Sequence, residues 1–471
     1  MDRTKVSEYH LGLLVPRALS PSMIWTIGIF LSVLLQYSSA AAQALRFQPQ
    51  GASATGQGNA FVAQADDPSA IHYNPAGLTQ VAGLQAYMGT ALVGGSINFT
   101  APTGATARGD LGGSVAFPPP SHFYMSANLG ALGLTGLSAV TAGIGVTSPF
   151  GLNIRYPTDG PFNTAVTSAT LPLIDIKPAL AYKVTDSLSI GLNADIYTFA
   201  SFLGEGQAQQ QQVWPGGGGI PAGASLEVSG NGTGAGFAAS LLYTPLKSGE
   251  GLPVLSIGFT YHSQAVLPLS GALLVNGTKA SDGSASLVLP QIFSGGIALW
   301  PIRTVEREWK LEVDVEYVGW QSARNLDIHL SNGVTIPQPQ QWKNVPVVAL
   351  GTEYKWLSPE WLRHWDVALR GGYTRTQDPV PDRTFNPATI SLTANTISVG
   401  GGFLCREGGR FLRMIPCGGE SRLLPKAIGV DAAYQAWIYE SRTVTGNINP
   451  TVNGNYRVSV QVGIVSLRFV Y

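Results

Sequence analysis

Residues 309–319, WKLEVDVEYVG, show the clearest alternation of apolar and charged residues in the chain. Successive side chains of an extended strand point to opposite faces, so this stretch has one apolar face and one charged face. The apolar face consists of Trp309, Leu311, Val313, Val315 and Tyr317, and the charged face of Lys310, Glu312, Asp314 and Glu316. A strand of a soluble two-layer protein also alternates, with its charges toward water, so this stretch alone leaves the class of protein open.

Repetition of the alternating pattern along the chain indicates the class of protein. From about residue 84 onward, similar alternating segments begin near Ile174, Leu188, Leu255, Trp365 and Ile428. Several have an aromatic residue at one end of the apolar face, as in the aromatic girdles of membrane barrels. Short connections alternate with long polar ones at 101–120, 147–171, 204–232, 275–285, 331–341, 376–389 and 441–455. We therefore predict an all-β fold, a transmembrane antiparallel β-barrel of roughly fourteen strands over residues 84–471.

Composition supports this class and excludes others. The 471 residues carry 28 Lys and Arg against 28 Asp and Glu, only 12% of the chain is charged, and the mean hydropathy is +0.14. A nucleic-acid-binding protein needs a basic excess, and a disordered chain is rich in charge and poor in aromatic residues. A helical membrane protein needs repeated apolar runs of about 20 residues, which are missing after residue 44.

The first 44 residues have the pattern of a secretory signal peptide. Arg3, Lys5 and Arg17 precede an apolar run at residues 23–35, and small residues follow in SSAAAQA. We expect cleavage after Ala44, with an uncleaved anchor as the alternative. Residues 45–83 differ from the rest of the chain, because they are rich in Gly, Ala, Asn and Asp and lack alternation. Turn signals at 66–68 and 74–75 predict a compact segment of short helices and turns.

Residues 51–78, GASATGQGNAFVAQADDPSAIHYNPAGL, resemble the N-terminal hatch of the FadL/TodX-type (OmpP1) family of outer-membrane transporters for long-chain fatty acids and hydrophobic hydrocarbons. The resemblance rests on the glycine-rich residues 51–58, on ADDPSA at 65–70 and on Asn74, Pro75, Ala76 and Gly77. It continues in SPFGL at 148–152, in the strand at 309–320 and in residues 368–403.

The resemblance implies that residues 45–83 form a hatch that plugs the barrel. It implies passive uptake of long-chain fatty acids or other hydrophobic compounds across the bacterial outer membrane, with a lateral exit in the third strand. In this sequence Gly143 and Gly145 are the candidates for that opening, although small lipid-facing residues are an equally good explanation. The expected partners are a hydrophobic small-molecule ligand, outer-membrane lipid and the barrel-assembly machinery, with the protein as a monomer and no nucleic acid.

Ligand contacts are sought among aromatic residues of the hatch and the long loops, because burial of apolar area contributes about 25 cal/mol per Å². The candidates are Phe47, Phe61, Phe150, Tyr156 and Phe162, with Arg155 as a partner for a carboxylate and Trp214 as a further possibility. The alternative for each residue is that its side chain packs within its own loop instead of contacting a ligand. For the acidic face of residues 309–319 we expect charge ladders inside the barrel, with cations such as Arg370 and Lys177.

Catalytic and cofactor motifs are missing from the sequence. It has no GxSxG, HExxH, Walker or GxGxxG motif, and its six histidines are dispersed, so we predict neither an enzyme nor a cofactor or metal site. His72 is explained by packing and the pair Asp66-Asp67 by a turn. Cys405 and Cys417 are candidates for a disulfide in an exported protein. Two other functions remain open: a general diffusion porin, and a surface barrel such as an adhesin.

Overall fold

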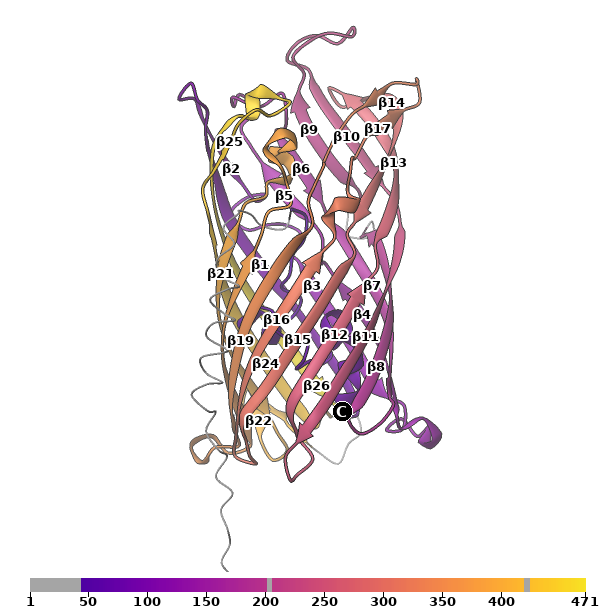
Figure 1. Cartoon of the computed structure of the whole chain (residues 1–471), viewed down its shortest axis with the longest axis vertical. Helices are drawn as coiled ribbons and strands as arrows, with labels where there is room; N and C mark the ends of the chain where they lie inside the picture. The colour runs from indigo at the N-terminus through magenta and orange to yellow at the C-terminus, as the bar shows by residue number, and fades with distance from the viewer. Residues whose placement is uncertain (1–43, 201–205, 419–423) are drawn as a thin grey trace, which may run out of the picture. The chain divides into compact units, whose positions relative to one another are not determined.

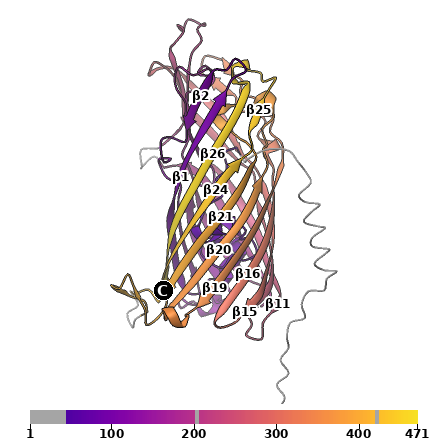
Figure 2. The ribbon, with the colours of Figure 1, turned by 90° about the vertical axis from the view of Figure 1, so that its left-hand side faces the viewer.

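The structure is a computed structural model that describes residues 44–200, 206–418 and 424–471. The predicted signal peptide therefore lies outside the described residues, apart from Ala44. Fourteen antiparallel strands form a closed barrel (Figures 1 and 2). Several of these barrel strands are divided into shorter segments. The segments of the wall are β1 (Leu84–Thr100), β2 (Thr106–Asp110), β3 (Ser121–Asn128), β4 (Val140–Thr147), β5 (Leu152–Arg155), β6 (Ser168–Leu171), β7 (Leu173–Lys183), β8 (Leu188–Phe199), β9 (Ala208–Val213), β10 (Ser225–Asn231), β11 (Gly234–Lys247), β12 (Pro253–His262), β13 (Ala265–Val275), β14 (Thr278–Leu289), β15 (Ile292–Arg303), β16 (Arg307–Val318), β17 (Ile328–Leu330), β18 (Thr335–Ile336), β19 (Val345–Leu357), β20 (Trp365–Thr376), β21 (Ala394–Cys405), β24 (Ala427–Tyr439), β25 (Arg442–Val444) and β26 (Gly454–Val470).

The barrel closes because its last strand pairs with its first. β26 runs antiparallel to β1 from Gln85 opposite Val470 to Thr100 opposite Asn455. Closure leaves no free sheet edge, which is the condition for a sheet to cross a lipid bilayer. Separately, no helix among the described residues is long and apolar enough to cross a membrane.

β16 shows that the two faces of the wall meet two different surroundings. Its apolar residues lie on the outer surface, where Val313 is 43% exposed, whereas the charged Lys310, Glu312 and Asp314 are at most 2% exposed. A soluble protein would have the opposite arrangement, with its charges outside. The alternation noted in the sequence is therefore lipid-facing outside and polar inside.

Most short connections lie at one end of the barrel and most long ones at the other, as the alternation of short and long connections in the sequence predicts. At the end of the barrel that holds the C-terminus, the wall turns within residues 184–187, 248–252 and 304–306, and we assign this end to the periplasm. The opposite end carries longer connections, including 377–393 and 440–453, with the short 3₁₀ helices η4 (Trp320–Ser322), η6 (Asp382–Thr384), η7 (Pro387–Thr389) and η8 (Pro450–Val452). The periplasmic turns hold η2 (Thr135–Leu137) and η5 (Glu360–Leu362).

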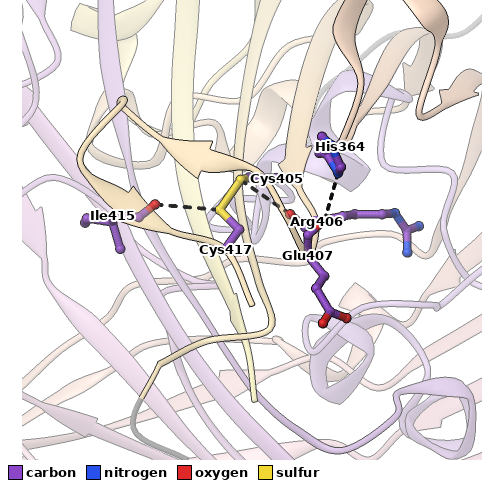
Figure 3. The surroundings of a disulfide bond; sticks show 6 residues. All are labelled: His364, Cys405, Arg406, Glu407, Ile415 and Cys417. Atoms are coloured by element: carbon purple, nitrogen blue, oxygen red, sulfur yellow. Dashed lines mark hydrogen bonds between the residues drawn. A yellow bond between two sulfur atoms is a disulfide. The ribbon is translucent and has the colours of Figure 1, made fainter. Parts of the chain in front are cut away.

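One periplasmic connection departs from this rule. Residues 406–426 are long and include a small hairpin of β22 (Arg410–Phe411) and β23 (Ile415–Pro416). A disulfide between Cys405 and Cys417 ties the hairpin to the end of β21 (Figure 3).

The N-terminal segment, residues 45–83, lies inside the barrel. It contains α2 (Ala52–Gly56), α3 (Ala70–Tyr73) and η1 (Pro75–Gln80), which agrees with the short helices and turns expected from its sequence. From residue 49 to residue 78 every residue except Asp66 is buried. Buried backbone and polar side chains need hydrogen-bond partners, and the inner face of the wall supplies many of them.

Glycines of the wall let the N-terminal segment approach closely. A Cβ on Gly258 would lie 2.2 Å from the carbonyl oxygen of Val62, and a Cβ on Gly191 would lie 2.2 Å from the backbone nitrogen of Ala76. Any side chain at these positions would collide with backbone. The glycines in these strands therefore mark contacts between the wall and the N-terminal segment.

Candidate functional site

Acidic side chains on the inner face of β16 accept hydrogen bonds from the backbone of the N-terminal segment. Asp314 Oδ2 accepts hydrogen bonds from the N–H groups of Phe61 and Val62 at 2.7 and 2.9 Å. Glu312 Oε1 accepts from the N–H groups of Ala63 and Gln64 at 2.7 and 3.2 Å. Four consecutive N–H groups thus bind two buried acidic side chains, which supply partners to backbone donors that are buried away from water.

Two cations complete this face. Arg46 donates to Glu316 through its two terminal guanidinium nitrogens, Nη1 and Nη2, at 2.5 and 3.0 Å, and Lys310 Nζ lies 2.6 Å from Glu312 Oε2. The expectation that Arg370 and Lys177 would be these partners is wrong. A charged side chain inside the barrel pairs with the nearest opposite charges, which lie on its own strand and on nearby strands. The pairs observed are Arg370 with Glu353 and Asp431, and Lys177 with Asp175 and Asp195.

The Asn-Pro-Ala-Gly sequence at 74–77 anchors the other end of the N-terminal segment. The Asn74 side-chain oxygen Oδ1 accepts a hydrogen bond from Ala76 N–H at 3.1 Å and caps η1, with Pro75 in its first turn. The Asn74 amide donates to the carbonyl of Val62 at 2.8 Å and to that of Leu241 in the wall at 3.1 Å. A Cβ on Gly77 would lie 2.3 Å from the Ala65 carbonyl oxygen, so this position also requires glycine.

Two buried titratable side chains of the N-terminal segment have shifted pKa values. Burial holds the pKa of His72 well below its usual range, with further lowering by Lys177, His262 and Arg46 and an opposing effect of Asp195. His72 packs edge-on against Tyr73, and its buried Nδ1 has no hydrogen-bond partner among the residues that the structure describes. Burial also raises the pKa of Asp67 to about 6, although Ser69 donates two hydrogen bonds to it.

The wall is broken beside the N-terminal segment. β3 and β4 pair as far as Phe123 opposite Val146, and pairing of the same two barrel strands resumes only at Asp110 opposite Arg155. Residues 111–122 and 147–154 between these points have no ladder pairing with each other. Pairing continues through Gly143 and Gly145 on both sides of β4, so the wall is not broken at these two glycines. They face inward, where a Cβ on Gly143 would lie 2.8 Å from Ile71.

At the break, the N-terminal segment takes the place of a neighbouring strand. Phe47 N–H donates to the Pro149 carbonyl, and Gly151 N–H donates to the Leu45 carbonyl, both at 2.8 Å. The Gln50 side chain both donates to and accepts from the backbone of Ser148, at 3.1 Å each. Residues 148–151 are therefore held by the N-terminal segment in the stretch where they lack a wall partner.

Two cavities lie in different parts of the barrel. One, of about 510 Å³ toward the periplasmic end, is lined by charged residues of both signs, among them Asp66, Lys183, Arg303 and Arg468. The other, of about 250 Å³ toward the long-loop end, is mostly apolar, and none of its described lining residues is charged. Its walls come from β6, β9, β10, β13 and β14, together with Leu45, Leu152 and Trp214. Leu152 lies within the wall break, where the Leu45 carbonyl accepts a hydrogen bond from Gly151 N–H.

The aromatic residues proposed from the sequence fall mostly beside this apolar cavity rather than in its lining. Phe150, Tyr156 and Phe162 are buried in the large apolar cluster of the long-loop half, where Tyr156 and Phe162 meet edge-on at 4.9 Å. Phe61 packs edge-on against Tyr73, and the ring centroids of Phe47 and Trp437 lie 6.1 Å apart. Arg155 is exposed and is absent from the lining. These assignments remain proposals, and Trp214 alone of the side chains named in the sequence lines the cavity.

Sequence reasoning did not single out two features that line the cavity. The glutamine tract forms β9, from which Gln209, Gln210 and Gln212 line the cavity. A second Asn-Pro-Ala turn begins η7, where the Asn386 side chain accepts from Ala388 N–H at 2.9 Å, as Asn74 does in η1. The repetition of Asn-Pro-Ala within one chain is the sequence signal that could have identified this second turn.

A closed antiparallel barrel with an apolar outer face and a polar inner face defines the class of outer-membrane β-barrel proteins, and here the N-terminal segment fills the lumen. A family model described as outer membrane protein transport protein (OMPP1/FadL/TodX) matches residues 33–407. The chain belongs to this family, so it is an outer-membrane protein of a transport family rather than an enzyme.

Comparison with individual proteins agrees with this membership. A putative outer membrane protein of Neisseria meningitidis serogroup B, NMB0088, is 30% identical over 147 residues, which span 30% of each chain. A FadL homologue of Pseudomonas aeruginosa superposes with a TM-score of 0.68 at 17% identity, over 91% of this chain and 99% of that one. The toluene transporter TbuX of Ralstonia pickettii gives 0.57 at 16%, with the same coverage. At these identities the structures establish the fold.

Proposed function

We propose that the protein takes up small hydrophobic compounds passively, and that it prefers uncharged compounds to fatty-acid anions. The observation that carries the proposal is the apolar cavity of about 250 Å³ whose described lining has no charge. A carboxylate buried there would lack a counter-charge, which is costly. The amides of Gln209, Gln210 and Gln212 would serve hydroxyl or carbonyl groups instead.

We further propose that the N-terminal segment is the plug and that the ligand leaves sideways through the wall break. An apolar compound gains nothing from a water-filled exit, whereas the outer mouth of the break carries the exposed apolar residues Val115 and Phe117. The path from Leu45 and Leu152 to this mouth would keep the ligand out of the charged periplasmic cavity. A general diffusion porin is disfavoured, because the N-terminal segment occupies the lumen.

Uptake of labelled toluene and oleate tests the choice of substrate. Cells lacking the gene are complemented with the parent or with Ala169→Trp, which fills the cavity from β6. We expect toluene uptake to fall to the level of the deletion strain and oleate uptake to depend little on the protein. Ala131→Trp, at an exposed periplasmic turn, is the matched control. Protein-dependent uptake of oleate without that of toluene would reverse the proposed preference.

The lateral exit has a separate test. Lysines in place of Val115 and Phe117 put charge at the outer mouth of the break, so they should slow uptake if the ligand passes there. Val334→Lys, at an exposed position of the long-loop end, is the control. Folded barrel is verified for each variant by heat-modifiable migration in gels. Unchanged uptake in the double variant would favour an exit toward the periplasm.

A further inference from the structure

The disulfide-bonded hairpin of residues 405–418 packs on the outer side of the wall. In β21 the lipid-facing residues are Ile397, Val399 and Phe403, and Cys405 continues the same face. Cys405, Cys417 and Ile428 are buried together, with Trp365, Phe411 and Phe469 against them. Figure 2 shows the chain that follows β21 projecting sideways from the wall beside the C-terminus. The hairpin is thus continuous with the lipid-facing surface at its periplasmic edge.

Several contacts fix the hairpin in this place. Arg406 N–H donates to the His364 carbonyl at 2.7 Å, and the Arg406 side chain forms an ion pair with Asp366. His364 Nδ1 lies 2.9 Å from the Glu407 carbonyl oxygen (Figure 3). Trp365 and Phe411 stack with ring centroids 6.1 Å apart. The hairpin is therefore anchored on β20 and its preceding turn as well as by the disulfide.

The tip of the hairpin presents apolar and cationic side chains together. Leu412 and Met414 are 67% and 72% exposed, and Arg410 and Arg413 are exposed without an ion pair among the described residues. Leu412 and Arg413 both have positive φ, at 50° and 61°, in a tight turn. Such turns favour Asn-Gly, because other residues pay a steric penalty there. The turn itself does not explain why an apolar and a cationic residue occupy these two positions.

We propose that this hairpin is a binding surface for anionic phospholipids of the inner leaflet. Leu412 and Met414 enter the boundary between headgroups and acyl chains, while Arg410 and Arg413 bind headgroup phosphates. Guanidinium groups match phosphate oxygens in geometry and charge, and amphipathic elements with cations beside apolar residues lie at this depth in membranes. Continuity with the lipid-facing wall favours lipid over a periplasmic protein as the occupant.

Oxidation of Met414 provides the test. The full-length mature protein is placed in nanodiscs of phosphatidylethanolamine alone or with added phosphatidylglycerol, and peroxide oxidation of each methionine is followed by mass spectrometry. Met88 and Met125 lie on the lipid-facing wall and serve as internal references. We expect slower oxidation of Met414 when phosphatidylglycerol is present. Replacing both arginines by serine should remove this difference, each arginine accounting for roughly a fivefold effect.

A matched double variant, Arg108→Ser with Arg324→Ser, removes two exposed arginines from the opposite end of the barrel and should leave the Met414 rates unchanged. The chain unfolded in urea gives the rate of unprotected methionine. Equal Met414 rates in the two kinds of nanodisc would overturn the recognition of anionic lipid. A rate equal to that of the unfolded chain would overturn the location of the hairpin, and a periplasmic protein would then be the better occupant.

Discussion

Substitution of Asp314 by alanine should release the N-terminal segment from the wall. Asp314 Oδ2 is the acceptor for two adjacent buried N–H groups, those of Phe61 and Val62. Leaving a buried N–H donor without a partner costs about 1–3 kcal/mol, so losing both hydrogen bonds costs about 2–6 kcal/mol. Part of this cost is offset because the variant no longer buries a carboxyl group. We expect docking to weaken by roughly 3 kcal/mol, which is more than a hundredfold in the ratio of docked to undocked protein.

Single-channel conductance in planar bilayers measures the consequence. An undocked segment opens the lumen to water and ions, so Asp314→Ala should show frequent conducting states where the parent is mostly closed. Asp314→Asn keeps an oxygen acceptor and should conduct less often than the alanine variant. Asp282→Ala, which removes an exposed carboxylate of the long-loop end, is the control. Protease digestion of residues 45–83 in folded barrels reports docking independently.

If Asp314→Ala conducted like the parent while its N-terminal segment became accessible to protease, the plug assignment would be refuted. If the segment also stayed protected, the hydrogen bonds to Asp314 would contribute far less than calculated. If the Asp314→Ala variant lacked the gel migration of a folded barrel, Asp314 would be needed for assembly of the barrel.

Three further predictions concern the same segment. Deletion of residues 45–83 should leave an assembled barrel with a raised leak of small polar solutes, and an unchanged leak in a liposome-swelling assay would contradict the plug assignment. Gly258→Val should lower the midpoint of thermal unfolding, because its side chain meets the Val62 carbonyl, whereas Gly295→Val points into open space and should have little effect. Docking should weaken as pH falls through about 6.5, because the released segment binds a proton at His72 that the docked segment resists. The raised pKa of Asp67, about 6, has the opposite effect, because a docked segment that binds a proton at Asp67 is favoured in acid. The leak of small solutes is therefore measured from about pH 7.5 to 5.5 in the Asp67→Asn variant, which lacks this effect. Adding His72→Gln to that variant should remove the dependence of the leak on pH.

The sequence alone predicted the barrel, because a strand in a membrane wall must alternate between two surroundings along its whole length. This local rule is readable in residues 309–319 and in each later segment, and the number of strands followed from counting them. The N-terminal segment was also recognisable, since its composition departs from alternation. Because this segment has no alternating pattern, its resemblance to the family rests on short motifs such as residues 74–77.

Only the tertiary structure decided which groups meet inside the barrel. Arg46 pairs with Glu316 although 270 positions separate them, and Asp314 binds backbone N–H groups that no side-chain pattern marks. In the wall break between residues 111–122 and 147–154, the N-terminal segment holds residues 148–151 in place of a strand, whereas Gly143 and Gly145 make room for Ile71. Pairing partners and cavities depend on the register and tilt of strands far apart in the chain, so local alternation does not specify them.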